Sequence, residues 1–221
     1  MDNPWIKLRN TAGIYILESD REQILRYNAR RRDSTELVLK SVPEPFIGNP
    51  NKATLILLLL NPGHSPDDPK AHSDPAFKKT LLRNLQHQET DFPFYPLNPA
   101  FSGTPTAQWW IPRTRKLKEA AEISDAELSE KLMAIEWFPY HSKSSGLPEN
   151  IICDSQRYSF HLVKQMLDNG KLVVRMRSKR HWQGVDQRTL QHALKNPRSS
   201  YISKNNSAGE LFDHMVEALR S

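Results

Sequence analysis

The segment 54–60 limits the possible folds of this chain more than any other part of the sequence. After Thr54 it is wholly aliphatic, and it ends at Asn61-Pro62-Gly63, residues that are typical of turns. A short, continuous apolar run bounded by turn residues indicates a strand buried on both faces of a parallel sheet. Leucine is not a strong strand former, so a buried helical stretch is the alternative. The proline and glycine residues at both ends argue against that alternative.

Weaker signals place the other elements of the fold. Apolar runs at 132–138 and 171–176 predict two more strands, and 35–39 is either a strand or a helical turn. Helices are predicted at 22–28, 77–88, 113–121 and 156–168, and after two capping boxes at 124–127 and 207–210. Because strands alternate with helices, we predict an α/β fold with a parallel sheet covered on both sides.

The length of the chain, 221 residues, is enough for one domain with a substantial core. Its first forty or so residues are highly charged, so we expect an N-terminal extension, 1–42, packed on an α/β domain, 43–221. The formal net charge is +6. Such a charge favours encounter with polyanions, nucleic acid first.

Cysteine usage and hydropathy indicate the compartment. Cys153 is the only cysteine, which excludes an intrachain disulfide and a CxxC metal site. The first residues lack the pattern of a secretory signal, and the apolar run 55–60 is too short to cross a bilayer. We therefore expect a soluble cytoplasmic protein with no membrane partner. The sequence leaves its oligomeric state open.

Ligands of parallel α/β sheets bind beyond the carboxyl ends of the strands, so the loops at Asn61, Pro139 and Arg177 should gather at one edge. In the first loop, Pro62 stiffens the turn and Gly63 lets a ligand approach the backbone closely. Asn61 carries one acceptor and two donors, so it can orient a water molecule or a polar ligand. The alternative is that Asn-Pro-Gly simply ends a strand.

Other polar residues allow two interpretations each. The run Arg177, Lys179 and Arg180 contacts a nucleic acid or belongs to a strand that leaves the core with one face wet. Glu136, inside the second predicted strand, lies at the solvent end of the sheet or has a catalytic or base-recognition role. The histidines show no metal-binding pattern, so we expect no metal site. His64 and His141 stand apart from the others because both follow core strands.

Two short motifs occur in a recognisable order. Asn61-Pro62-Gly63-His64 follows the first core strand, and Asn196-Pro197-Arg198-Ser199 precedes the last helix. Together with the alternating α/β pattern they resemble the uracil-DNA glycosylase superfamily. The first motif is similar to that of the mismatch-specific branch, and the resemblance spans about residues 43–219. It implies a three-layer α/β/α domain with a four-stranded parallel sheet, and excision of a base from DNA.

The resemblance also implies roles for individual residues. Asn61 would position the attacking water, with Pro62, Gly63, His64 and His141 around the base. Asn196 would lie against the leaving base as the second catalytic residue. Ser199 or Ser203 would touch the phosphate next to the flipped nucleotide. Contacts with DNA are implied for a further group of residues: Arg177, Lys179, Arg180, Arg198 and Tyr201.

The chain departs from the family pattern at three points. Arg198 stands where the second motif usually has serine. The position of the bulky wedge residue holds Ser200, although Tyr201 or Arg198 could replace it. The aromatic ring that stacks on the base is not singled out, and its candidates are Phe92, Phe94, Tyr95 and Phe101, of which Tyr95 and Phe101 enter the predicted site.

These observations lead to one main hypothesis and one alternative. The main hypothesis is a DNA glycosylase-like enzyme that hydrolyses the N-glycosidic bond of uracil or another damaged base, in single- or double-stranded DNA, without a cofactor. The alternative is an inactive protein of the same fold that binds a nucleobase, a nucleotide or nucleic acid. The chain contains no GxSxG, GxxxxGK[ST] or GxGxxG, which argues against a serine hydrolase and against common nucleotide-binding loops.

Overall fold

The central sheet of the computed structural model, which describes residues 1–31, 34–144, 147 and 150–221, has the strand order β4-β6-β5-β8. The strands are β4 (Phe46–Ile47), β6 (Leu132–Glu136), β5 (Leu55–Leu59) and β8 (Leu172–Arg175). β5 pairs in parallel with β6 on one side and β8 on the other. Every residue of β5 is buried. Its central position explains the unbroken apolar run, and the strand prediction is confirmed.

The edge strand β4 runs antiparallel to β6, with Phe46 opposite Ile135. The expectation of a fully parallel sheet is wrong at this edge. A parallel neighbour needs a crossover of about a dozen residues or more. Only a short turn joins β4 to β5, in which the carbonyl of Asn49 accepts hydrogen bonds from Lys52 and Ala53. The chain therefore reverses direction before β5 begins.

At the opposite edge of the sheet, the segment that precedes the second motif runs alongside β8. Arg175 and Ala193 form an isolated parallel bridge. The Arg175 N–H donates to the His192 carbonyl at 2.9 Å, and the Leu194 N–H donates to the Arg175 carbonyl at 3.1 Å. The segment that leads to Asn196 thus runs in the same direction as β8 and ends at the same edge of the sheet.

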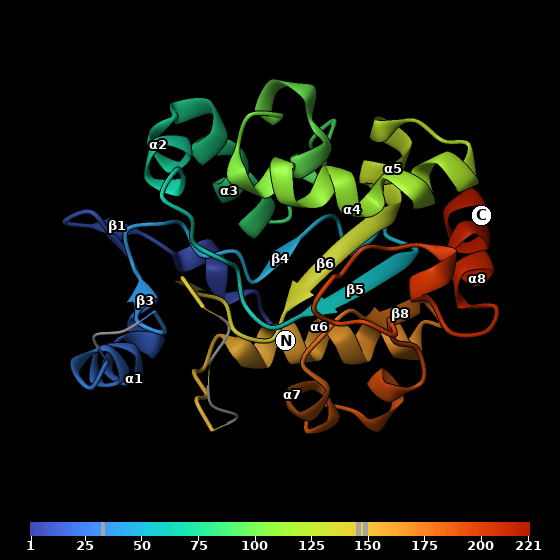
Figure 1. Cartoon of the computed structure of the whole chain (residues 1–221). Coiled ribbons are helices and arrows are strands. Elements are labelled where there is room, and N and C mark those ends of the chain that lie inside the picture. The colour runs from blue at the N-terminus through green and yellow to red at the C-terminus, as the bar shows by residue number, and fades with distance from the viewer. Residues whose placement is uncertain (32–33, 145–146, 148–149) are drawn as a thin grey trace.

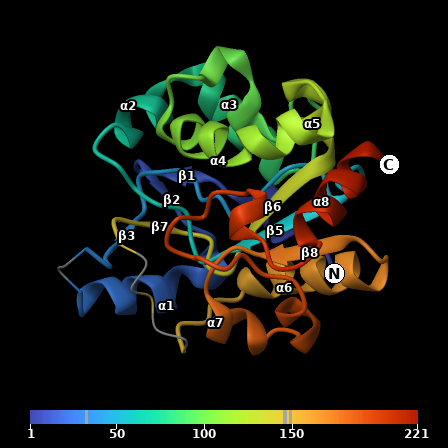
Figure 2. The same ribbon diagram turned by 45° about the vertical axis from the view of Figure 1, so that its right-hand side comes forward.

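Helices lie on both sides of this sheet (Figures 1 and 2). α3, α4 and α5 lie over one face, α6 and α7 lie under the other, and α8 contacts α4 and β5. The helices are α1 (Glu18–Ala29), α2 (Asp68–Ser73), α3 (Pro75–Leu85), α4 (Pro105–Ala121), α5 (Asp125–Lys131), α6 (Gln156–Asp168), α7 (Lys179–Gln183) and α8 (Leu211–Arg220). Within the described ranges, no helix has both the length and the apolar content needed to cross a membrane.

Local signals set several helix ends as expected, but two predictions fail. The capping box at Ser124 is present, and α6 has its predicted bounds. α4 begins eight residues earlier than the predicted 113–121, because Thr104 caps it and Pro105 occupies its first turn. The second predicted capping box is wrong. Ser207 Oγ donates to the Ser203 carbonyl instead, and α8 begins after Glu210 without a side-chain cap.

The described residues among 1–42 contact the loop that follows β6 and the short strand β7 (His141–Ser142). The segment contains a short 3-10 helix (Pro4–Lys7), the hairpin β1 (Asn10–Thr11) and β2 (Ile14–Tyr15), α1 and β3 (Leu37–Val38). β3 pairs antiparallel with β7 (His141–Ser142), just after the end of β6. The Tyr140 hydroxyl donates to Asp20 at 2.7 Å and accepts from the Leu17 N–H at 3.3 Å. These contacts fix the loop that follows β6.

Candidate functional site

A cleft of about 490 Å³ lies at the carboxyl edge of the sheet. Its walls are the last residues of β5 and β6, the loops that follow these two strands, the first half of α4, and Arg177 after β8. The expected convergence of the three strand-end loops is therefore found. A volume of this size is ordinary for a small-molecule or nucleobase site.

Asn61 lines the cleft with a fixed orientation. Its Nδ2 donates to Ser142 Oγ at 2.8 Å and faces the carbonyls of Pro62 at 3.1 Å and Tyr140 at 3.3 Å. Carbonyl oxygens only accept hydrogen bonds, so the amide nitrogen of Asn61 faces them and Oδ1 lies at the opposite end of the amide group. Within the described part of the chain Oδ1 has no hydrogen-bond partner. An amide held in this way presents an acceptor that can orient a water molecule.

The two residues after Pro62 complete this wall of the cleft. A Cβ added at Gly63 would meet no protein atom within 4 Å, so the backbone is open to a ligand there. The Gly63 carbonyl accepts a hydrogen bond from His141 Nδ1 at 2.7 Å. His64 Nδ1 lies 3.5 Å from an oxygen of Asp68, and no described residue makes a hydrogen bond with this buried nitrogen. Burial lowers the pKa of His64 more than Asp68 raises it.

Glu136, the last residue of β6, is buried at 7% exposure and lines the cleft. Its Oε2 has no hydrogen-bond partner among the described residues. Burial raises the pKa of this carboxyl to about 8, although Arg177 acts in the opposite direction. At neutral pH the group is mainly protonated and offers one donor and one acceptor. Of the two interpretations from the sequence, the structure excludes a solvated position at the end of the sheet.

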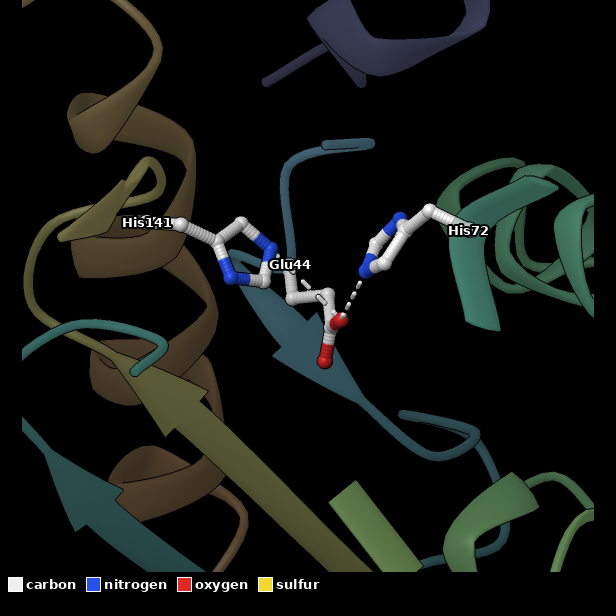
Figure 3. A group of neighbouring side chains, drawn as sticks. All are labelled: Glu44, His72 and His141. Atoms are coloured by element: carbon white, nitrogen blue, oxygen red, sulfur yellow. Dashed lines mark ion pairs between the residues drawn. The ribbon is translucent and has the colours of Figure 1, made fainter. Parts of the chain in front are cut away.

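A second buried glutamate, Glu44, lies between two histidine rings (Figure 3). Its Oε1 is 3.7 Å from His72 Nε2 and 3.5 Å from His141 Nε2. Its Oε2 accepts a hydrogen bond from the Tyr95 hydroxyl at 2.8 Å. Burial raises the pKa of Glu44, and the neighbouring His141 opposes this shift. Sequence patterns do not predict this cluster, because Glu44 lies in a proline-rich connector.

Donor atoms of Glu44, His72 and His141 lie close enough together to hold a metal ion, as do those of His64, Asp68 and His141. The hydrogen bonds of the rings argue against such a site. His72 Nδ1 faces the Val42 N–H at 3.2 Å, so it accepts and the ring proton is on Nε2. Both nitrogens of His141 face carbonyl oxygens, those of Gly63 and Val42. With its proton on Nε2, His72 directs an N–H rather than a lone pair toward Glu44, whose Oε1 lies at ion-pair distance from both rings.

The aromatic wall of the cleft differs from the one expected. Trp109 and Trp110 of α4 line it, and Tyr95 and Phe101 do not. Tyr95 is buried against Phe77 at a centroid distance of 5.9 Å, and Phe101 packs on the same ring at 5.2 Å. Both tryptophans precede the helix predicted at 113–121, and they enter the cleft wall because α4 begins at Pro105.

The second motif lies beside the cleft rather than in it. Asn196 is exposed, and its Oδ1 accepts from the N–H groups of Arg198 at 3.1 Å and Ser199 at 3.3 Å. Ser200 connects this loop to the cleft, because its Oγ accepts from Arg177 Nη2 at 2.6 Å. The other predicted site residues that do not line the cleft are Lys179, Arg180, Arg198, Ser199, Tyr201 and Ser203.

The position of the first motif thus agrees with its expected place at a ligand cleft, while Asn196 is not brought into the lining. Comparison of the chain with protein-family models, with curated proteins and with solved structures finds no match in any of the three.

Proposed function

We propose that the protein is a DNA glycosylase-like enzyme that hydrolyses the N-glycosidic bond of uracil or another damaged base. The observation that carries the proposal is that one cleft holds both the fixed Asn61 amide and the buried carboxyl of Glu136, whose Oε2 has no hydrogen-bond partner among the described residues. One can hold the attacking water, and the other can donate a proton or a hydrogen bond to the departing base.

The chemistry of the bond explains why both groups are needed. Cleavage builds positive charge on the sugar and negative charge on the base. Water held by Asn61 Oδ1 attacks the anomeric carbon as the bond to the base breaks, and the proton that the water loses ends on the departed base. The Glu136 O–H stabilises charge that grows on the base, an effect that is largest in a site shielded from water. Glu136 takes the role that the resemblance gave to Asn196, whose Oδ1 is engaged within its own loop.

The rest of the proposal follows from the position of the cleft. The target nucleotide is extruded from the strand, and its base stacks on Trp109. The arrangement proposed for the whole domain is the three-layer α/β/α fold of the resemblance, and the reaction uses no cofactor. We also propose a cytoplasmic location, because Cys153 is the single cysteine and the chain therefore has no intrachain disulfide.

One observation favours the alternative, a binding protein without catalysis. Ser200, at the wedge position, is fully buried and bonded to Arg177, so it cannot fill the space that a flipped base leaves in a duplex. The nearest bulky candidate is Tyr201, whose exposed fraction is 46%. A protein with this loop could bind a base that is already unpaired without having to extrude it.

The experiment uses labelled single- and double-stranded DNA that contains uracil, hypoxanthine or an oxidised pyrimidine. Abasic sites are detected as strand breaks after alkali. We expect Asn61→Ala to lower the rate of their formation by about 100-fold, since a preorganised polar contact at a reacting centre is worth this much or more. Asn205→Ala, at an exposed asparagine outside the cleft, is the matched control and should keep full activity.

Two other results are informative. Equal activity of the Asn61→Ala variant and the wild type would contradict the assignment of the water-binding residue. Salt-sensitive binding of the same oligonucleotides without any abasic sites would favour the binding protein.

A further inference from the structure

The edge of the cleft carries two arginines stacked on aromatic rings. The Arg113 guanidinium lies 4.0 Å from the centroid of the Trp109 ring and 5.1 Å from that of Tyr201. The Arg177 guanidinium lies 5.8 Å from the Trp109 centroid. We name these residues, with Ser200, the guanidinium rim. Three segments that are distant in sequence meet here: α4, the turn after β8 and the loop of the second motif.

Backbone and side-chain contacts hold the rim in place. The Ile202 N–H donates to the Arg113 carbonyl at 3.0 Å, which ties the late loop to α4. Arg113 Nη1 donates to the Trp109 carbonyl at 2.7 Å. Arg177 is tied to the same loop through Ser200 Oγ. The two guanidiniums are therefore oriented before any ligand arrives.

Most of the donors on these arginines make no hydrogen bond with a described residue. A guanidinium has five N–H groups, and each of the two uses one in a hydrogen bond with a described residue. The Nε atoms of both are buried without a partner in that part of the chain. Neither arginine forms an ion pair with a described carboxylate. Arg188 shows the ordinary arrangement, since it pairs with Asp168 and Asp186 at 2.8 Å each.

The electrostatic situation of the rim is unfavourable without an anion. Burial lowers the pKa of Arg113; the neighbouring Tyr201 opposes this shift, and the charge of Arg177 adds to it. Glu136 is the carboxyl near Arg177, and its raised pKa of about 8 leaves it mainly neutral at pH 7. Contacts with aromatic faces offset only part of the cost of two partly desolvated like charges.

We propose that the guanidinium rim is a phosphate subsite, in which Arg113 and Arg177 bind the phosphate of a nucleotide whose base enters the cleft. This rests on the proposed function in that it assumes a nucleotide-containing ligand. The planar fork of arginine matches the oxygens of phosphate and binds them in pairs. Trp109 forms part of both the rim and the cleft wall, so the phosphate and the base bind next to each other.

The first arm of the test measures binding of small ligands by calorimetry. Deoxyuridine and deoxyuridine 5′-monophosphate differ only in the phosphate. We expect the wild type to bind the monophosphate at least ten times more tightly than the nucleoside. The double variant Arg113→Met/Arg177→Met keeps the apolar stems and should bind both ligands equally. Arg115→Met, which removes an exposed arginine of the same helix, should match the wild type.

The second arm uses a single-stranded, uracil-containing oligonucleotide as the probe. The slope of log affinity against log salt should fall by about 0.7 in the Arg→Met double variant, the value expected for the loss of one phosphate contact. Arg113→Lys/Arg177→Lys keeps the charges but not the fork, so it should keep the slope and lose affinity for the monophosphate. This variant also serves if the Met variant does not fold.

The outcomes separate the rim from the catalytic proposal. A phosphate preference that disappears with the rim arginines, in a protein that forms no abasic sites, would support the subsite and contradict the glycosylase activity. Abasic sites formed by a protein whose Met and Lys double variants both bind the monophosphate like the wild type would overturn the subsite and leave the activity standing. The subsite also fails if Arg115→Met weakens binding as much as the rim variants do.

Discussion

Glu136 combines burial with an oxygen that has no partner among the described residues. A buried carboxylate without a partner costs several kcal/mol, and the group avoids this cost by keeping its proton. The proton is thus part of the structure of the cleft. A ligand that meets Glu136 at neutral pH meets a hydrogen-bond donor rather than a negative charge.

The pH dependence of stability should reveal this proton. The pKa of Glu136 is about 8 in the folded protein, above its ordinary value of 4.5. The stabilisation from its protonated form is complete below about pH 4.5 and is lost as the pH rises through 8. The side chain introduced by Glu136→Gln is neutral at every pH, so this variant does not lose stability in this way as the pH rises. The melting temperature of the variant should therefore rise relative to that of the wild type between pH 5 and 9.

Differential scanning calorimetry across this pH range provides the measurement. Glu44 also has a raised pKa, but it is present in both proteins, so the difference between them isolates Glu136. Glu217→Gln, at an exposed position of α8, is the control and should follow the wild type. If the melting temperatures of Glu136→Gln and the wild type change with pH in parallel, the carboxyl of Glu136 is ionised in the folded state.

The residues of the first motif could be placed in the cleft from the sequence, because a turn that ends a buried parallel strand has only one edge to occupy. Glu44 and Trp109 could not. Glu44 stands out only because of its contacts with Tyr95, His72 and His141, which come from distant parts of the chain. A local pattern carries no information about such partners.

Among the elements, those with complete local signals were predicted well. β5 and α6 have continuous apolar or capped patterns, and their observed bounds differ from the predicted ones by at most one residue at each end. The direction of β4 was not predictable in this way. It depends on the short connection between β4 and β5. This connection starts at a glycine that lies in close contact with the backbone of β6.

That glycine, Gly48, should tolerate no side chain. Its φ is +118°, and an added Cβ would lie 2.6 Å from the Leu132 carbonyl oxygen. We expect Gly48→Ala to lower the free energy of unfolding by about 2 kcal/mol or more, from backbone strain and from displacement of β6. Gly103→Ala, where a Cβ meets nothing within 4 Å and φ is not positive, is the control.

Urea denaturation of the two variants measures this difference. A Gly48→Ala protein as stable as Gly103→Ala would mean that β4 and β6 separate easily, and that the edge strand is not fixed by this contact.

On the scale of the whole molecule, Tyr140 joins the N-terminal segment to the cleft. Its hydroxyl bonds to the fully buried Asp20, and its carbonyl accepts from Asn61 Nδ2. We expect Tyr140→Phe to lower the free energy of unfolding by about 1–3 kcal/mol, the cost of leaving a buried partner unsatisfied. Thermal unfolding checks this value. Tyr15→Phe removes a hydroxyl that makes no hydrogen bond with the described residues, so it should cost less.

During synthesis, β5 leaves the ribosome before both of the strands that flank it in the sheet. Leu55 pairs with Leu132 and with Leu172, and neither strand exists while the first half of the chain is being made. An unpaired aliphatic strand of this kind self-associates readily, and sheets built from such distant pairings form slowly. The newly made chain therefore needs to keep this segment apart from its copies, by chaperones or by transient local structure, until β8 has emerged.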